Sequence, residues 1–309
     1  MPSLRIATRQ SKLALWQAEH VAALLRAAHS SLQVELVKLT TQGDRILDRP
    51  LAEIGGKGLF IKELEVALSE RRADIAVHSM KDVPSELPPG MTLASMLPRA
   101  DARDAFVSNR YANLESVPPG ARVGTSSLRR VSQLRFLRSD VEITPLRGNV
   151  DTRLRKLDAG EFDAIILASA GLMRLGLADR ITQRLSFDQS LPAVGQGIIG
   201  VECRSDDARS TGLVRALNDP DTQVCIAAER AFAQRLEGSC QSPIAGYAEL
   251  TGGSLNLRGL IASIDGKQVF RDVIVGPQEN ATALGRALAE RMLLTGADKL
   301  LADLRGGAH

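Results

Sequence analysis

A short sequence pattern occurs twice in the first two-thirds of the chain and limits the folds that this part can adopt. Arg5-Ile6-Ala7-Thr8 resembles Arg122-Val123-Gly124-Thr125, and a serine and a helical pattern follow each of them. Two further pairs of strand-like segments recur in the same order, namely 34–36 with 141–143 and 74–79 with 163–169. This recurrence predicts two similar α/β domains.

The pattern within each repeat is a strand followed by a helix. Leu4–Thr8 reads as a buried strand, and Ser11 is the expected N-cap of a helix that runs to about His29. Strands that alternate with helices predict a mostly parallel sheet, and ligands of such sheets bind beyond the carboxyl ends of the strands. We therefore expect two such domains to face each other across a ligand-binding cleft.

A third, smaller α+β domain is predicted after the repeats. It contains a helix at about 220–236, three strands, a hairpin turn at Asp265-Gly266, and helices from about Asn280. Segments 98–104 and 191–200 are candidate crossovers between the first two domains. The predicted division is 1–98 plus 198–218 for the first domain, 99–197 for the second and 219–309 for the third.

Composition excludes several classes of protein. A net charge of +3 and an aromatic content of 3% argue against a nucleic-acid-binding protein. The longest apolar run, at about 164–173, is too short to cross a bilayer, and residues 1–10 lack the apolar core of a secretory signal. The four histidines are scattered without the spacing of a metal site, so we expect no metal.

The three cysteines, Cys203, Cys225 and Cys240, fit neither a disulfide framework nor a zinc pattern, which predicts reduced thiols in the cytoplasm. Cys240 follows the helix predicted at 220–236, with Gly238 just past the helix end and Pro243 stiffening the exit. It should lie on an accessible loop. The stretch alone leaves open a stray surface cysteine or a functional thiol.

Basic and hydroxyl side chains gather after predicted strands in both repeats. A helix N-terminus binds anions, and arginine recognises carboxylate or phosphate with two parallel hydrogen bonds. The set predicts a site for a small polyanionic ligand, although a solvated helix face is an alternative, especially for Arg135 and Arg138. Its members are Arg9, Ser11, Lys81, Thr125, Ser126, Ser127, Arg129, Arg130, Arg147, Asn149, Arg153 and Arg174.

Two further features lie near this set. Asp82 follows a buried strand and is either a turn-capping residue or the carboxylate that meets a cationic part of the ligand. Gly55-Gly56-Lys57-Gly58 lacks the serine or threonine of a phosphate loop, so a mobile lid is the better interpretation.

Taken together, these motifs resemble those of the hydroxymethylbilane synthase family, also called the porphobilinogen deaminase family. The resemblance covers nearly the whole chain; Ile198, Ser242 and Glu53 depart from residues common in the family. The matching motifs are Gly56–Phe60, His78–Pro84, Gly124–Arg130, Leu146–Asn149, Leu191–Gly197 and Gly238–Gln241.

The resemblance implies a monomeric cytoplasmic enzyme of tetrapyrrole biosynthesis, with two periplasmic-binding-protein-like domains and a third that carries a cofactor cysteine. It implies that four porphobilinogen molecules condense, with loss of ammonia, into linear hydroxymethylbilane. It also implies a dipyrromethane cofactor held by a thioether to Cys240, with Asp82 as the catalytic residue. The basic and hydroxyl residues named above, together with Lys57 and Gln196, would bind cofactor and substrate.

The residues suit this chemistry, because each porphobilinogen ring carries an acetate and a propionate group that arginines can bind. Loss of ammonia leads to cationic species, which a carboxylate such as Asp82 can stabilise. Two alternatives remain open from the residues alone: a two-domain anion-binding protein and a thiol acyltransferase. A covalent adduct of two pyrrole units on the thiol is expected only for the synthase.

Overall fold

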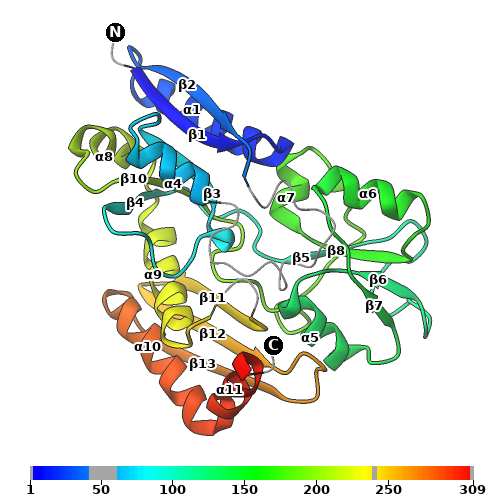
Figure 1. Cartoon of the computed structure of the whole chain (residues 1–309). Coiled ribbons are helices and arrows are strands. Elements are labelled where there is room, and N and C mark those ends of the chain that lie inside the picture. The colour runs from blue at the N-terminus through cyan, green and yellow to red at the C-terminus, as the bar shows by residue number, and fades with distance from the viewer. Residues whose placement is uncertain (1–2, 42–60, 239–241, 307–309) are drawn as a thin grey trace. The chain divides into compact units, whose positions relative to one another are not determined.

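The computed structural model describes residues 3–41, 61–238 and 242–306 (Figure 1). The chain separates into two compact units, Met1–Ala100 with Gly197–Gln223, and Asp101–Gln196 with Val224–His309. The chain first passes from one unit to the other between Ala100 and Asp101, and it returns between Gln196 and Gly197.

The first unit contains a five-stranded sheet in the order β2-β1-β3-β10-β4. β1 is parallel to both β2 and β3, whereas β10 is antiparallel to β3 and β4, so the sheet is mixed. The strands are β1 (Ser3–Arg9), β2 (Gln33–Leu39), β3 (Ile75–Ser79), β4 (Met91–Met96) and β10 (Ile199–Arg204). The helices are α1 (Lys12–Ala28), α4 (Lys62–Ser69), α8 (Ala208–Val214) and the short η1 (Met80–Asp82) and η3 (Arg215–Leu217).

The second unit contains a sheet of the same design, in the order β7-β6-β8-β5-β9. β6 is parallel to β7 and β8, and β5 is antiparallel to β8 and β9. The strands are β5 (Asp104–Val107), β6 (Arg122–Gly124), β7 (Glu142–Thr144), β8 (Ala164–Ala168) and β9 (Gln183–Arg184). The helices are α5 (Leu128–Leu137), α6 (Val150–Asp158), α7 (Ser169–Arg174) and the short η2 (Ala178–Arg180).

The two sheets share a local hydrogen-bond pattern as well as a strand order. In the first, Arg5 N donates to Asp74 Oδ2 at 2.8 Å, and Asp74 N donates to Arg5 O at 2.9 Å. In the second, Arg122 N donates to Asp163 Oδ2 at 2.9 Å, and Asp163 N donates to Arg122 O at 2.9 Å. The repeat predicted from the sequence is therefore confirmed, and it includes the aspartate that directly precedes the third strand of each repeat.

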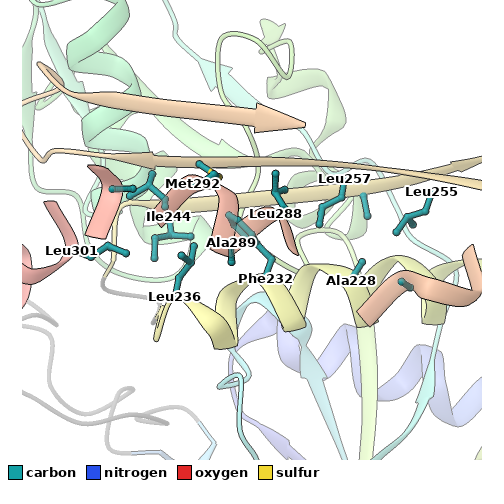
Figure 2. Close-up of a cluster of buried hydrophobic side chains, with 14 of the residues drawn as sticks. Ala228, Phe232, Leu236, Ile244, Leu255, Leu257, Leu288, Ala289, Met292 and Leu301 are labelled. Atoms are coloured by element: carbon teal, nitrogen blue, oxygen red, sulfur yellow. The ribbon is translucent and has the colours of Figure 1, made fainter. Parts of the chain in front are cut away.

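The second unit also contains a three-stranded antiparallel sheet, in the order β11-β12-β13. Its core holds Phe232, Leu257, Leu288 and Met292, all fully or almost fully buried (Figure 2). The strands are β11 (Ile244–Thr251), β12 (Ser254–Ala262) and β13 (Val269–Pro277). The helices are α9 (Pro220–Arg235), which enters this unit at Val224, α10 (Ala281–Met292), α11 (Asp298–Gly306), the 3-10 turn η4 (Gln278–Asn280) and the π turn η5 (Leu293–Ala297).

A local sequence signal explains where α1 begins. Ser11 caps α1 as predicted, because its Oγ accepts a hydrogen bond from Ala14 N at 3.3 Å. Within the described ranges, no helix is both long and apolar enough to cross a membrane.

Candidate active site

The carboxyl ends of β1 and β3 carry a small pocket in the first unit, lined by polar and apolar side chains. Arg9 ends β1, Ser11 caps α1, and Asp82 ends the 3-10 turn that follows β3. These side chains line a cavity of about 60 Å³ together with Gln17, His78 and Ser79. The structure therefore brings together three of the predicted site residues, Arg9, Ser11 and Asp82.

The turn that carries Lys81 and Asp82 is fixed by its neighbours. Met80 N donates to Ile198 O at 3.0 Å, and Val83 N donates to Met80 O at 3.2 Å. Gly200 makes room for the turn, because a Cβ atom there would lie 2.2 Å from Met80 Sδ. Lys81 and Asp82 remain partly exposed, so the turn presents both charges at the end of the sheet.

Behind this turn lies a buried ionisable pair. His78 Nε2 lies 2.7 Å from Glu202 Oε2, and the two side chains are 4% and 0% exposed. Burial raises the pKa of nearby Glu65, and the charge of Glu202 raises it further, although His78 acts in the opposite direction. The pair shows that His78 is held in the interior beside a carboxylate.

In the second unit, the segment after β6 runs along the end of β7. Thr125 N donates to Thr144 O at 3.0 Å, and Ser126 Oγ donates to Leu146 O at 2.9 Å. Ser127 is the N-cap residue of α5 but makes no side-chain capping bond. The first turn of α5 has no acidic residue, so its N-terminal dipole faces no carboxylate of that turn.

Arg129 and Arg130, which were predicted to bind an external anion, both bind Asp104 in the interior. Arg129 Nη1 lies 2.9 Å from Asp104 Oδ2, and Arg130 Nη2 lies 2.7 Å from Asp104 Oδ1. Gln196 Nε2 donates to Asp104 Oδ1 at 3.0 Å and to Ala102 O at 2.6 Å. The two guanidinium groups are only 5% and 7% exposed, so the geometry gives them a partner within the protein.

The charges of this Asp104 cluster, defined here as Asp104, Arg129, Arg130 and Gln196, do not balance. Burial alone would raise the pKa of Asp104, but the charges of Arg129 and Arg130 outweigh it and hold the pKa well below its usual value. Burial and the neighbouring Arg130 lower the pKa of Arg129. Two guanidinium groups face one carboxylate, which leaves an excess of positive charge next to the N-terminus of α5.

The same edge of the second sheet holds polar atoms that lack a partner. Arg147 Nη1, Thr144 Oγ1 and Ser169 Oγ are buried and make no hydrogen bond within the described part of the chain. A buried polar atom without a hydrogen-bond partner lowers the stability of the fold unless a ligand or a water molecule binds it. Thr144 and Ser169 were not predicted as site residues, although each stands at the end of a predicted strand, the position at which ligands of such sheets bind.

The remaining predicted residues of this edge lie close along the chain. Asn149 is the N-cap residue of α6, and Arg153 Nε donates to Gly148 O at 2.7 Å. Arg174 ends α7, and burial lowers its pKa to about 10. The arginines thus fall into two groups: those of the Asp104 cluster, and those that follow β7 and β8.

Two predicted residues, Lys57 and Cys240, lie outside the described residues. The helix that precedes Cys240 ends one residue earlier than predicted: Glu237 has the left-handed φ of 53°, where Gly238 was expected. Glu237 N donates to Gln234 O at 3.0 Å and Gly238 N to Ala233 O at 2.9 Å, which is a Schellman motif with glutamate at its left-handed position.

The other two cysteines are buried. Cys203 lies in β10 with 0% exposure, and Cys225 lies in α9 with 7% exposure. Burial raises the pKa of the Cys203 thiol, which disfavours the reactive thiolate. Among the residues with described positions, no group of three or more His, Cys, Asp or Glu side chains could hold a metal ion.

Comparison with protein families identifies this arrangement. Residues 4–211 match the family model described as porphobilinogen deaminase, dipyrromethane cofactor-binding domain, and residues 223–294 match the porphobilinogen deaminase C-terminal domain. The chain belongs to the porphobilinogen deaminase family. It is accordingly a transferase of tetrapyrrole biosynthesis that polymerises porphobilinogen, and residues 4–211 include a dipyrromethane-binding domain.

One curated relative agrees with the family match. A curated porphobilinogen deaminase from Chromobacterium violaceum is 56% identical over 302 residues, which cover 98% of each chain. Among solved structures, the methionine-binding protein MetQ has a TM-score of 0.45 at 14% identity and covers 74% of this chain and 94% of its own. A periplasmic substrate-binding protein from Coxiella burnetii has a TM-score of 0.44 at 15% identity, covering 74% and 96%.

Proposed function

We propose that this porphobilinogen deaminase holds its dipyrromethane through a thioether to Cys240 and uses Asp82 as its catalytic carboxylate. In this role the enzyme condenses four porphobilinogen molecules into hydroxymethylbilane. The observation that supports binding of pyrrole carboxylates is the unpartnered Nη1 atom of Arg147, buried at the carboxyl edge of the second sheet. A buried guanidinium nitrogen at this edge calls for an acceptor, and the acetate and propionate groups of pyrrole rings supply carboxylates.

The donor set fits the cofactor as well as the substrate. Arg147 Nη1 can donate to a carboxylate, and the hydroxyls of Thr144 and Ser169 can add neutral hydrogen bonds. When bound, dipyrromethane supplies the terminal pyrrole carbon to which the first substrate is joined. Arg147, Arg153 and Arg174 are proposed to bind carboxylates of the cofactor and growing chain, with Ser127 and Asn149 as neutral donors. The Ser126 hydroxyl already donates to Leu146 O, so Ser126 is proposed to border the same ligand without donating from its side chain.

The Asp104 cluster is proposed to act on anions through its charge rather than through contact. Most of its guanidinium donors are used by Asp104 and by main-chain oxygens, since Arg129 donates to Leu191 O at 2.7 Å and Arg130 to Ile166 O at 3.0 Å. Arg129 Nε is buried and makes no hydrogen bond within the described residues. The excess positive charge favours carboxylates nearby, because such interactions are stronger in a low-dielectric interior than in water. Gln196 contributes by orienting Asp104.

Asp82 is proposed to stabilise positive charge as the substrate amine leaves. Its partly exposed carboxylate shares a pocket with Arg9 and Ser11, which are suited to hold a substrate carboxylate beside it. A pyrrole N–H can donate to Asp82, and that bond strengthens as the ring becomes cationic. Lys81, next to Asp82 on the same turn, is proposed to bind a further carboxylate, and Lys57 to act from the predicted lid.

The division into domains is proposed from the sequence pattern. We place three domains at 1–98 plus 198–218, 99–197 and 219–309, the last carrying Cys240. We further propose a cytoplasmic location, because three thiols without a disulfide pattern suit a reducing compartment. A monomer is proposed from the family resemblance alone.

Mass spectrometry tests the central claim. The purified chain should carry the mass of two pyrrole units, and a tryptic peptide spanning residues 236–258 should retain it. Cys240→Ala should fold, lack the adduct and release no ammonia from porphobilinogen. An unmodified parent chain that forms hydroxymethylbilane at a normal rate would refute the thioether.

A further inference from the structure

A histidine side chain borders the pocket that holds Asp82. His78 lies in β3, and it lines the same cavity of about 60 Å³ as Asp82, Arg9 and Ser11. Its imidazole is almost fully buried, and Nε2 lies 2.7 Å from Oε2 of the fully buried Glu202. An imidazole that borders a pocket and is held by a buried carboxylate has the arrangement of a general base with its orienting group.

The strand pairing sets the position of this pair. β3 and β10 are antiparallel, with His78 opposite Gly200 and Ala76 opposite Glu202. Side chains two residues apart on a strand lie on the same face of the sheet, so the imidazole and the carboxylate meet diagonally across the two strands. The ring is therefore held by the sheet itself, which places a functional group more rigidly than a loop does.

The hydrogen bond to Glu202 also decides which ring nitrogen can accept a proton. In a neutral imidazole one nitrogen donates and the other accepts, and the carboxylate takes the hydrogen bond from Nε2–H. The lone pair is therefore on Nδ1. Within the part of the chain that the structure describes, the imidazole of His78 makes no hydrogen bond other than the one to Glu202. Nδ1 is thus available to a ligand in the pocket.

The surrounding charges favour proton uptake by this ring. An imidazolium at His78 would lie beside the Glu202 carboxylate, whose charge stabilises it. A second carboxyl group, that of Glu65 on α4, is near enough for the charges of both His78 and Glu202 to act on its pKa. The pocket itself adds the carboxylate of Asp82 and one opposing charge, the guanidinium of Arg9.

The coupling of two pyrrole rings needs such a base. The aminomethyl carbon of the incoming porphobilinogen loses its amino group as ammonia and bonds to the free α-carbon of the preceding ring. The preceding ring is then cationic, and its α-hydrogen must leave as a proton before the ring is aromatic again. Asp82 is proposed to keep a hydrogen bond from a pyrrole N–H during this step, so a second group is required for the α-proton.

We propose that Nδ1 of His78 accepts this α-proton, with Glu202 as the positioning residue that orients the ring and stabilises the imidazolium. The inference rests on the proposed role of the Asp82 pocket. In each coupling a C–C bond forms, the C–N bond of the substrate breaks, and the electron pair of the α-C–H bond returns to the pyrrole ring. The proton passes from His78 to water before the next coupling.

The test uses porphobilinogen that carries deuterium at its free α-carbon. His78→Gln is the main variant, because its amide N–H can still donate to Glu202 while no basic nitrogen remains. We expect hydroxymethylbilane formation per adduct-bearing chain to be slower by roughly a hundredfold or more. Proton transfer should become rate-limiting, so the primary isotope effect should rise above that of the parent, which a purely structural defect would not cause. First-turnover ammonia release should stay near the parent rate, because it precedes the proton transfer.

Three further variants make the result specific. Glu202→Gln keeps an acceptor for Nε2–H but loses the charge, so its rate and isotope effect should lie between those of the parent and His78→Gln. His78→Ala leaves space for a small base, so imidazole added to the buffer should restore part of the rate. His29→Gln should match the parent, because His29 also bonds through Nε2 in the first unit, to Leu213 O at 2.9 Å, but does not line the pocket.

The outcomes separate the claims. A parent-like rate in His78→Gln would overturn the role of His78. A slow His78→Gln with the parent's isotope effect, together with no rescue of His78→Ala by imidazole, would make His78 a structural residue and would also overturn it. Both results leave Asp82 standing. Unchanged ammonia release in Asp82→Asn would instead refute the proposed pocket, and the role of His78 with it. If His78→Gln does not fold, the isotope effect in Glu202→Gln decides the question.

Discussion

Arg130 Nη2 lies 2.7 Å from Asp104 Oδ1, and neither side chain is more than 7% exposed. Arg129 binds the same carboxylate from the same turn of α5. Asp104 begins β5, at the edge of the sheet where β8 ends, because Asp104 pairs with Ala168. Arg129 and Arg130, which were predicted to bind a ligand, therefore also join α5 to the sheet through Asp104.

This relationship predicts that Asp104→Asn destabilises the fold. The change leaves two buried guanidinium groups without a carboxylate, and removal of one partner of a buried ion pair typically costs about 3–5 kcal/mol. Urea unfolding at pH 7 measures the loss. Asp140→Asn is the control, because the Asp140 side chain is 39% exposed and the change should cost much less stability than Asp104→Asn. A stable Asp104→Asn protein would contradict the structural role.

The same pair predicts how the stability of the folded state changes with pH. The pKa of Asp104 is lowered in the folded state, so its stabilising contribution is present above the pKa of the unfolded chain. It is lost as the pH falls below that value. The stability difference between the parent and Asp104→Asn should therefore shrink below about pH 4, which acid titration of both proteins by circular dichroism can follow.

Arg130→Leu and Arg147→Leu should differ in what they damage. Arg130→Leu removes a partner of Asp104, so it should lower the unfolding free energy. Arg147 has a buried nitrogen without a described partner, so Arg147→Leu should unfold near the parent value but elongate poorly. Each lost charge-assisted contact should cost about 1.5–3 kcal/mol in binding. If Arg147→Leu elongates the chain normally with porphobilinogen, this edge of the second sheet does not bind its carboxylates as proposed.

Glu65 gives a second prediction about stability and pH. Its contribution to stability falls as the pH rises, whereas that of Asp104 grows. Burial raises its pKa in the folded state, so its contribution to stability is full below the pKa of the unfolded chain and declines as the pH rises through the folded value. Glu65→Gln should therefore be more stable than the parent at pH 7 and equal to it near pH 3. Thermal unfolding across this range is the measurement, and a constant difference would contradict it.

The left-handed residue Glu237 allows a test of backbone strain. Glu237→Gly and Glu237→Ala both remove the side chain, so their difference reports the backbone alone. Glycine should be the more stable of the two by about 1 kcal/mol, because only glycine adopts a positive φ freely. Equal unfolding free energies for the two variants would mean that the turn changes conformation when the side chain is lost.

Sequence reasoning succeeded where local patterns decide structure. Ser11, the repeated strands and the aspartates Asp74 and Asp163 all followed from short motifs. It did not predict that Arg129 and Arg130 bind Asp104, because that carboxylate lies 25 and 26 residues away, on a strand whose pairing depends on the whole sheet. Their role toward the cofactor and substrate stays a prediction. Tertiary pairing of distant charges is not encoded in any local spacing.

The same limit applies to His78 and to the unpartnered hydroxyls. His78 binds Glu202, which is 124 residues distant and reaches it only because the chain returns to the first unit in β10. Thr144 and Ser169 could not be singled out from the sequence, since serine and threonine at strand ends are common in loops and caps. Burial without a partner distinguishes them, and burial is a property of the fold.

Asp82 is the residue whose loss should separate binding from chemistry. Its carboxylate is partly exposed in the pocket that also holds Arg9 and Ser11. Asp82→Asn keeps the shape but removes the charge. Electrostatic stabilisation of this kind is typically worth about 2.7–4 kcal/mol, or roughly a hundred- to a thousandfold in rate. Single-turnover ammonia release at saturating porphobilinogen measures the effect on chemistry.

Two further variants make the result specific. Asp82→Glu keeps the charge but displaces it by one methylene, so it should retain more activity than Asp82→Asn, and the adduct should remain detectable by mass. Asp265→Asn, in the exposed hairpin turn, removes a carboxylate of the same charge far along the chain and should leave the rate unchanged. A rate for Asp82→Asn within a few-fold of the parent would reduce Asp82 to a turn residue, because a carboxylate that stabilises a cationic transition state cannot lose its charge at so small a cost.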